Sequence, residues 1–220
     1  MDKRLALVTV HFEAPLGACA VFSRFHGDVC APDRICSPII SPASAERLDF
    51  QIPGRPDRQV GAFRIPSTAP SPRRIVAEGH EIANHTYSLP DLKRLSPQGI
   101  VREIRAAEEA IVRVAGVKPK FFRATNGELN ESLRDLVQKE GYAVLDSTLD
   151  SGDWRNPSQA KLMRVILDGA KPGSVILAHE NFPKSAKQMP AVSDALVKRG
   201  FVFCTASELR PPASPLVPAP

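Results

Sequence analysis

The chain has 220 residues, of which 43% are hydrophobic and 24% charged, and its formal net charge is +5 at pH 7. This length suits one domain with a sizeable buried core, and the composition is that of a soluble globular protein. Lys and Arg are dispersed rather than gathered in runs with interleaved aromatic residues, so we expect no nucleic-acid partner. No apolar run approaches the roughly 20 residues of a membrane span, so we expect no membrane span either.

The N-terminus predicts a first β-strand at residues 4–10. The apolar stretch there is six residues long, which is shorter than the core of about 7 residues that a signal peptide needs. Taken as written, the sequence predicts a cytoplasmic protein, whereas an incomplete N-terminus would make it a secreted or cell-wall protein. The four cysteines, at positions 19, 30, 36 and 204, lack zinc-finger spacing, so we expect free thiols.

Residues 16–72 differ in character from the rest of the chain. They are rich in Pro, Arg, Ser and Cys and show no sustained period of 2 or 3.6 residues. Because a structureless loop of this length is uncommon inside a compact domain, the segment is either a lineage-specific insertion or a gene-model fault such as a frameshift or a retained intron. Sequencing the transcript across codons 10–75 separates the two, since an uninterrupted read in this frame excludes the fault.

From residue 73 onward the sequence predicts alternating helices and strands. The best-defined helix has Ser96 as its N-cap, Pro97 as its first residue and Gly116 as its stop. Strands that alternate with helices of about ten residues indicate parallel βα units. The apolar face of the helix between Ser96 and Gly116 is Ile100, Ile104, Ala107, Ile111 and Val114. Further helices are expected at 73–78, 131–140, 158–167 and 190–199, and strands at 80–84, 120–123, 142–145, 174–178 and 201–204. Residues 210–220 are expected to form a disordered, Pro-rich tail.

Residues 78–90 are the most informative stretch. They read Glu-Gly-His-Glu-Ile-Ala-Asn-His-Thr-Tyr-Ser-Leu-Pro and place His85 beside Thr86 after an apolar strand. This segment resembles the metal-binding motif His-Ser/Thr-x-x-His of the NodB-type polysaccharide deacetylases, carbohydrate esterase family four. The resemblance makes His85 the first metal ligand, and Leu89 stands where the second would be. Two histidines at this spacing share one side of a helical turn, but Leu89 cannot coordinate a metal.

The first family motif, Thr-Phe-Asp-Asp-Gly-Pro, corresponds to residues 9–15, which read Thr-Val-His-Phe-Glu-Ala-Pro. The resemblance sets His11 against the catalytic base and Glu13 against a metal carboxylate, so the base Asp is absent. Two residues apart on a strand, these side chains point to one face and would complete a two-His, one-carboxylate set with His85. The alternatives are that Glu13 faces solvent at a strand end and that His11 is a core residue.

The third and fourth motifs are better kept. Arg123 matches the Arg of Arg-x-Pro-x-Gly, which in relatives positions the catalytic Asp. The fourth motif is whole as residues 150–154, Asp-Ser-Gly-Asp-Trp. By resemblance Asp150 tunes the catalytic His, while Trp154 and Asp153 belong to the sugar groove; the alternative for Trp154 is a buried structural role.

The fifth motif, Leu-x-Leu-x-His, corresponds to residues 175–179, Val-Ile-Leu-Ala-His. The resemblance makes His179 the general acid that protonates the leaving amine, and Leu177 the apolar floor under the acetyl methyl group. The family resemblance as a whole covers residues 73–209 well and residues 4–15 weakly. In the family a divalent metal, expected here to be zinc, activates water for amide hydrolysis.

The expected fold is α/β, a distorted (β/α) barrel of the NodB type over residues 1–209, irregular at 16–72, with the site at the carboxyl ends of the strands. The expected function is metal-dependent N-deacetylation of N-acetylglucosamine polysaccharides or oligosaccharides such as chitin, weakened or lost in this form because a ligand and the base are missing. The alternatives are a non-catalytic carbohydrate-binding protein that uses the same groove and a hydrolase of a small cyclic amide. All these readings place His85 and His179 in one cleft.

Overall fold

A computed structural model of the chain describes residues 3–13, 17–23, 45–46, 65–66, 72–127, 129–179 and 182–209. Between residues 5 and 66 the description is limited to the path and pairing of the strands. The predicted disordered tail at 210–220 and most of the segment 16–72 lie outside the described residues.

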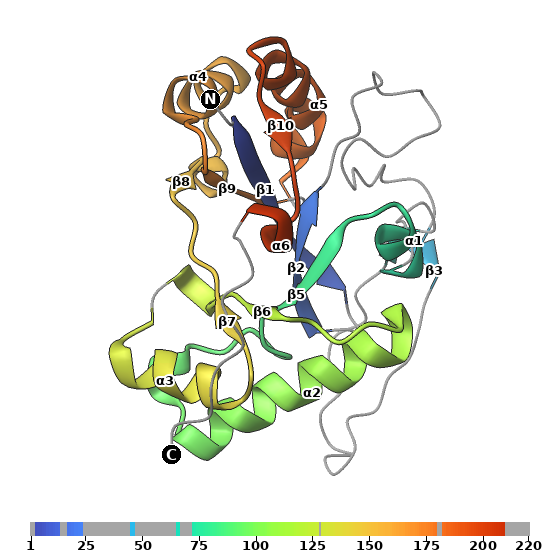
Figure 1. The fold of residues 1–220 in the computed structure, drawn as a ribbon, viewed down its shortest axis with the longest axis vertical. Coiled ribbons are helices and arrows are strands. Elements are labelled where there is room, and N and C mark those ends of the chain that lie inside the picture. Colours follow the sequence, from blue (N-terminus) through green and yellow to red (C-terminus); the bar gives the residue numbers. More distant parts are fainter. Residues whose placement is uncertain are drawn as a thin grey trace.

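The described strands form an α/β architecture around one eight-stranded sheet (Figure 1). The sheet order is β7-β6-β5-β2-β1-β9-β8, and β10 pairs in parallel with the first two residues of β1, Arg4 and Leu5. Neighbouring strands are parallel except for β2, which is antiparallel to both β1 and β5. The strands are β1 (Arg4–Glu13), β2 (Gly17–Ser23), β5 (Glu81–Asn84), β6 (Phe121–Phe122), β7 (Ala143–Val144), β8 (Leu149–Asp150), β9 (Val175–His179) and β10 (Val202–Phe203), while β3 (Ala45–Glu46) and β4 (Ile65–Pro66) pair with each other.

The strand β2 corrects the expectation of irregular structure from residue 16 onward. It pairs along seven residues with β1 and continues the sheet to β5. Its sequence, Gly-Ala-Cys-Ala-Val-Phe-Ser, has no alternation of apolar and polar residues, which is the pattern by which a half-buried strand is recognised. The strand is therefore identified by its pairing and not by its composition.

The helices are α1 (Pro72–Ala77), α2 (Pro97–Ala115), α3 (Glu131–Lys139), α4 (Gln159–Gly169), α5 (Pro183–Lys198) and α6 (Ala206–Leu209), with short 3-10 turns η1 (Leu92–Arg94), η2 (Thr125–Gly127) and η3 (Asp153–Arg155). The predicted caps of α2 are confirmed: Ser96 accepts a hydrogen bond from the backbone of Gly99, and Gly116 ends the helix at φ 75°.

Helix α5 begins earlier than its sequence indicates. A start at Pro190 was expected because proline suits the first turn of a helix, where its missing N–H costs nothing. In the structure Pro183 takes that first position, and Pro190 lies inside the helix. The earlier start adds seven residues, about two helical turns, soon after β9, at the edge of the sheet where site residues were expected.

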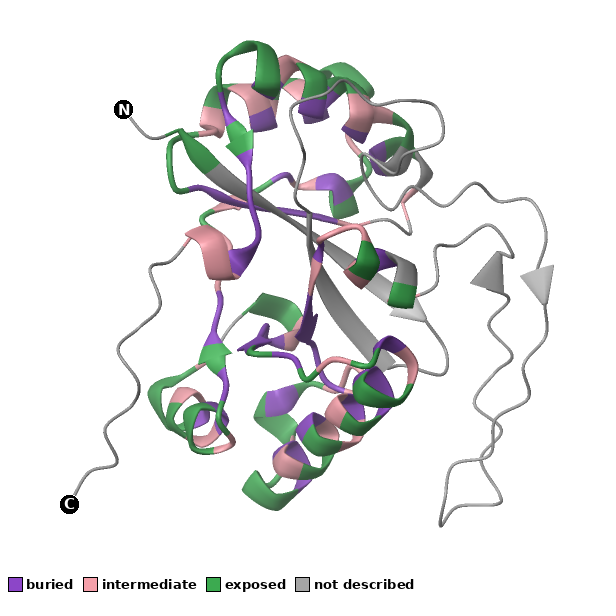
Figure 2. Cartoon of the chain, turned by 45° about the vertical axis from the view of Figure 1, so that its right-hand side comes forward, coloured by how far each residue is buried: buried purple, intermediate pink, exposed green. Residues whose placement is uncertain are grey.

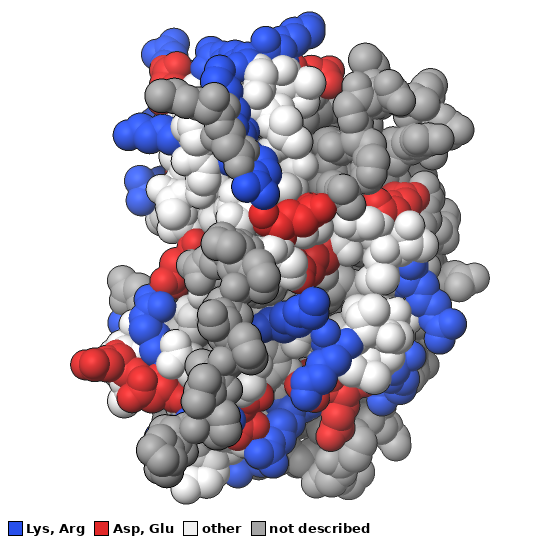
Figure 3. All heavy atoms as spheres, in the orientation of Figure 1, with Lys and Arg blue, Asp and Glu red and all other residues white. Residues whose placement is uncertain are grey.

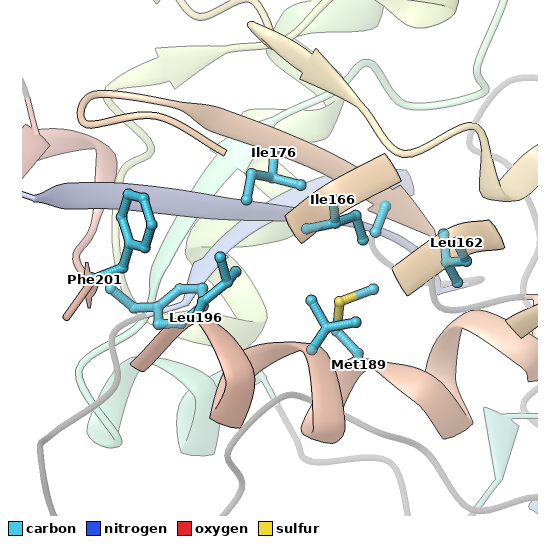
Figure 4. Close-up of a cluster of buried hydrophobic side chains, with 9 residues drawn as sticks. Leu162, Ile166, Ile176, Met189, Leu196 and Phe201 are labelled. Atoms are coloured by element: carbon cyan, nitrogen blue, oxygen red, sulfur yellow. The ribbon is translucent and has the colours of Figure 1, made fainter. Parts of the chain in front are cut away.

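The core lies between the helices and the sheet (Figure 2). In one cluster Ile166 of α4, Ile176 of β9, and Met189 and Leu196 of α5 are each at most 4% exposed (Figure 4). Full burial of such a side chain contributes roughly 1.5–3 kcal/mol. A second cluster packs α2 and α3 on β6 and β7. The first cluster holds β9 in place and the second holds β6, so the carboxyl ends of both strands are fixed by packing.

The surface carries both signs of charge. On the face shown in Figure 3, basic and acidic side chains are interspersed. Within the part of the chain that the structure describes, none of the helices has the length and apolarity needed to cross a membrane.

Candidate functional site

The sheet register brings three of the predicted site residues to one edge. Val10 of β1 lies opposite His179 of β9, and His11, the next residue of β1, lies opposite Cys19 of β2. Cys19 in turn lies opposite Asn84 of β5, which lies opposite Phe122 of β6. The residues that follow those two positions, His85 and Arg123, therefore leave the sheet at the same edge as His179. This is the carboxyl edge of the parallel strands, where sites of barrel proteins lie.

His85 is buried and neutral. It is 5% exposed, and its Nδ1 lies 2.8 Å from the backbone oxygen of Arg123. Because a carbonyl oxygen only accepts, Nδ1 carries the proton and Nε2 keeps a lone pair. The pKa of His85 is lowered to about 4, mainly by burial and also by the charges of Arg123 and His179, while the bond to the Arg123 oxygen acts in the opposite direction. Since the sheet register places His85 and His179 at the same edge, the two residues do not lie on opposite sides of the molecule.

The Asp153 carboxylate holds His179. Its Oδ1 lies 2.7 Å from His179 Nδ1, and its Oδ2 accepts hydrogen bonds from the His179 backbone N–H at 2.6 Å and from Ser185 Oγ at 2.9 Å. Burial raises the pKa of Asp153, but its bonds and the charge of His179 outweigh this and leave the pKa below its usual value. The carboxylate is therefore ionised at neutral pH, so Nδ1 of His179 donates to it and Nε2 is left for chemistry.

Asp150 makes a different contact from the one expected. Its Oδ1 accepts a hydrogen bond from the Gly152 backbone at 2.9 Å, and its Oδ2 accepts one from Trp154 Nε1 at 3.2 Å. The motif resemblance made Asp150 the partner of His179, but in the structure Asp153 binds His179. The reason is local geometry: the left-handed turn at Gly152 (φ 67°) leads into η3, which carries Asp153 toward β9. Asp153 is therefore the carboxylate on the imidazole, and Asp150 supports the indole.

Trp154 lies at the surface. It is 49% exposed, which excludes the alternative of a buried structural tryptophan. The Arg155 guanidinium lies 4.4 Å from the centroid of its ring. An exposed, anchored indole offers a face on which a sugar ring can stack.

Arg123 and Leu177 line the interior near the same edge. Arg123 is 5% exposed; burial lowers the pKa of its guanidinium and the charges of Asp146 and Asp150 raise it, and it remains a cation. Ile176 and Ala178 face the cluster formed with α4 and α5. Since side chains alternate along a strand, Leu177 points to the opposite side of β9, together with His179.

The loop after His85 is not the helical turn expected from the motif. Residues 85–90 contain bends, with Thr86 at φ 70° and Leu89 at φ 54°. A non-glycine residue in this left-handed region costs roughly 1–2 kcal/mol. The loop is held by α2, because both oxygens of Glu103 bind the Tyr87–Ser88 segment at 2.7–3.0 Å. The glutamate that positions this loop was missed, since nothing in the sequence links residue 103 to residues 87 and 88.

The described residues do not make a metal site. Among the side chains that the structure describes, no three His, Cys, Asp or Glu groups are arranged to hold a metal ion, and zinc catalysis needs about three protein ligands. His85 fits a ligand role through its free Nε2. The side chains of the other two predicted ligands, Glu13 and His11, lie outside the description, and the backbone of β1 carries both past the position opposite His179.

The fold and the site together define an α/β protein with an Asp–His pair beside an exposed tryptophan at the carboxyl edge of its parallel strands. A family model described as polysaccharide deacetylase matches residues 60–145. A chitooligosaccharide deacetylase of Azorhizobium caulinodans is 30% identical over 155 residues, covering 69% of this chain and 72% of that protein. The chain belongs to the polysaccharide deacetylase family, as the sequence motifs indicated.

Other relatives agree with this placement. A peptidoglycan-N-acetylglucosamine deacetylase of Bacillus cereus is 36% identical over 107 residues, covering 49% of this chain and 39% of that protein. A solved structure of T48 deacetylase with substrate is 33% identical with a TM-score of 0.59, covering 63% of this chain and 68% of that chain. The likeness confirms the predicted fold class. The chain spans 39–66% of the length of three of the curated relatives that it matches.

Proposed function

We propose that the chain is an N-deacetylase that hydrolyses the acetamide of N-acetylglucosamine-containing polysaccharides or oligosaccharides. The observation that carries this proposal is the Asp153–His179 pair, 2.7 Å apart, directly beside the half-exposed Trp154. A proton donor and a sugar platform are the two parts that cleavage of a sugar acetamide needs on the side of the leaving amine. Two of the relatives are named as a chitooligosaccharide deacetylase and a peptidoglycan-N-acetylglucosamine deacetylase, which supports this substrate class.

In this proposal His179 is the general acid. The Asp153 carboxylate binds Nδ1–H, so a proton on Nε2 is the one that His179 can give to the departing amine. Asp153 also stabilises the imidazolium that carries this proton. A positioned histidine contributes roughly 10²–10⁴-fold to the rate of such a step.

Two further groups would support the reaction. The Arg123 cation is buried near His85 and would stabilise negative charge that develops on the acetamide oxygen. Leu177 shares the His179 face of β9, where an acetyl methyl group would find an apolar contact. His85 is neutral, but a pKa of about 4 makes it a weak base. We therefore expect a slow enzyme, because the described residues supply an acid and no strong base.

Metal dependence is part of the proposal. A divalent ion would polarise the acetamide carbonyl and acidify a water molecule. Of the three predicted ligands, His85 is the one whose side chain the structure describes, and it would bind through Nε2. Glu13 and His11 are the further ligands that the family motif suggests.

The second candidate function is a non-catalytic carbohydrate-binding protein. It is favoured by the exposed, anchored Trp154 together with the non-coordinating Leu89 in the left-handed loop. Such a protein would bind the same oligosaccharides through the same groove and release no acetate.

Acetate release from N-acetylglucosamine oligomers and from peptidoglycan fragments, with and without added zinc or cobalt, tests the proposal. We expect metal-dependent release that His179→Ala abolishes. Oligomer binding that is lost on Trp154→Ala, without any acetate release, would instead establish the binding protein. Failure of both release and binding would contradict both functions.

A further inference from the structure

Two elements hold the carboxylate that orients His179. The strand β9 contributes the backbone N–H of His179, and the first turn of α5 contributes the hydroxyl of Ser185; both donate to the same oxygen, Asp153 Oδ2. Ser185 and Asp153 are each 2% exposed, so water does not compete for these bonds. Among the residues that the structure describes, the other oxygen, Oδ1, contacts the imidazole alone.

We propose that Ser185 is a positioning residue for His179: by holding Asp153 Oδ2, it keeps Oδ1 on Nδ1 and so keeps the imidazole in one tautomer and one orientation. The catalytic meaning of this inference rests on the proposed function, because it concerns the orientation of the proposed acid. The contact itself is a property of the fold.

The reason lies in the freedom of the aspartate. Rotation about the terminal bond of an Asp side chain has broad minima, so packing alone does not fix the plane of the carboxylate. A hydroxyl that donates to an ionised carboxylate makes a charge-assisted bond, about twice as strong as a neutral one. Ser185 thus fixes the plane of the carboxylate, with one oxygen on the hydroxyl and the other on the imidazole. Without the hydroxyl, the backbone N–H of His179 is left to hold Oδ2, the carboxylate plane turns more freely, and the Nδ1 proton of His179 loses its fixed acceptor.

The start of α5 is built around this contact. Pro183 occupies the first helical position, which places Ser185 in the first turn. Phe182, just before the helix, packs its ring edge-on against His179 with the ring centroids 5.7 Å apart. The segment after β9 therefore contacts both members of the pair, the imidazole through Phe182 and the carboxylate through Ser185.

The same helix provides a matched control. Ser193 also lies in α5 and is 3% exposed, and its Oγ has no hydrogen-bond partner among the described residues. Ser193→Ala therefore removes the same atom from the same helix at nearly the same burial, without removing a bond to Asp153. A general effect of losing a buried hydroxyl would appear in both variants, whereas a positioning effect would appear only in Ser185→Ala.

The test is the tautomer of His179, read from the ring nitrogen shifts of the full chain in ¹⁵N NMR. We expect the Nδ1–H form to dominate in the unsubstituted chain and in Ser193→Ala, a mixture or the Nε2–H form in Ser185→Ala, and return of the first pattern in Ser185→Thr, which keeps the hydroxyl. An unchanged His179 pattern in Ser185→Ala would overturn the proposal. If Ser185→Ala fails to fold, Ser185→Val fills the site without a donor, and an unchanged pattern in that variant would overturn it equally.

Kinetics give a second readout. We expect kcat for acetate release to fall on the order of tenfold in Ser185→Ala with KM unchanged, and neither to change in Ser193→Ala. An equal fall in both variants would refute the positioning role. If the unsubstituted chain releases no acetate, the proposed function fails while the tautomer still decides the role of Ser185, so the two failures are distinguishable.

Discussion

The two ends of the site differ in how far their contacts are fixed. At the end of β9, Asp153 receives three hydrogen bonds of 2.6–2.9 Å from His179 and Ser185. At the end of β5, His85 is held by one bond to a backbone oxygen, and the loop that follows passes through Leu89 in a left-handed conformation. The acid side is fully assembled from described residues, while the metal side has one suitable imidazole and a leucine in place of another.

The two parts of a family site can therefore diverge separately. The acid pair is held by contacts among β9, η3 and α5, and none of these contacts involves the loop after β5. Loss of a metal ligand therefore leaves the Asp–His pair and the tryptophan in place. Four experiments separate the two sides.

The largest expected effect is on the acid side. His179→Ala removes the group that we propose as the general acid for the leaving amine, so we expect acetate release to fall by roughly 10²–10⁴-fold. The measurement is initial rate on an N-acetylglucosamine oligomer at saturating substrate. Lys161→Ala, an exposed position on α4, is the control and should retain full activity. A His179→Ala rate within twofold of the control would refute the assignment.

On the metal side, His85 should make stability depend on pH. Its folded pKa of about 4 lies below its ordinary value of 6.5, so the unfolded chain binds the proton first and stability falls as pH drops from 6.5 toward 4. The loss over that range is roughly 3 kcal/mol in the metal-free protein. Asp153, whose pKa is lowered from 3.8, adds a loss of the same sign only at lower pH.

Urea unfolding with a chelator present, at about pH 7 and about pH 4.5, measures this slope. His85→Asn keeps a donor for the Arg123 oxygen but does not titrate, so we expect it to flatten the slope in this range. An equal slope in the variant and the unsubstituted chain would show that His85 is not the group responsible.

Leu89→His tests whether the missing ligand limits the metal side. Histidine is more common than leucine at positive φ, so the substitution adds an imidazole without worsening the backbone. We expect zinc affinity, measured by competition with a chromogenic chelator, to rise by about tenfold or more. Leu89→Asn is the matched control, because it relieves the same strain without a ligand and should leave zinc affinity unchanged. Equal affinities in the two variants would show that position 89 does not face the metal.

The smallest expected effect is at the sugar platform. Trp154→Ala removes the exposed ring, and we expect oligosaccharide affinity to fall roughly two- to tenfold, as for other aromatic stacking contacts. Calorimetric titration with a chitin oligomer measures this. Arg155→Ala, next to the same ring, tests whether the stacked guanidinium shields that face; tighter binding in Arg155→Ala and weaker binding in Trp154→Ala is the pattern expected for a stacking platform.

The sequence predicts most of the fold after residue 73, because the signals there are local. Ser96 and Gly116 mark the ends of α2 through their own capping chemistry, and these predictions are confirmed. The strand β2 was missed because its small residues show no periodicity, and the early start of α5 was missed because Pro183 and Pro190 both suit a first turn. The family membership followed from motif spacing and is confirmed by the relatives.

The site was less predictable because its contacts are not local. The motif gives two aspartates three residues apart, and only the turn at Gly152 decides that Asp153 reaches His179 while Asp150 binds the indole. Ser185 belongs to no motif, and its role depends on where α5 starts. The functional roles of the site residues remain predictions, as does the origin of residues 16–72; these residues are His179, Trp154, His85, Arg123, Glu13, His11 and Leu177.

Deacetylation itself is tested by mass spectrometry of a defined, fully acetylated N-acetylglucosamine oligomer incubated with the unsubstituted chain and added zinc or cobalt. We expect slow loss of acetyl groups from the oligomer, absent with His179→Ala and present with Ser193→Ala. An oligomer that binds to the chain and yet returns fully acetylated under every metal condition would contradict it.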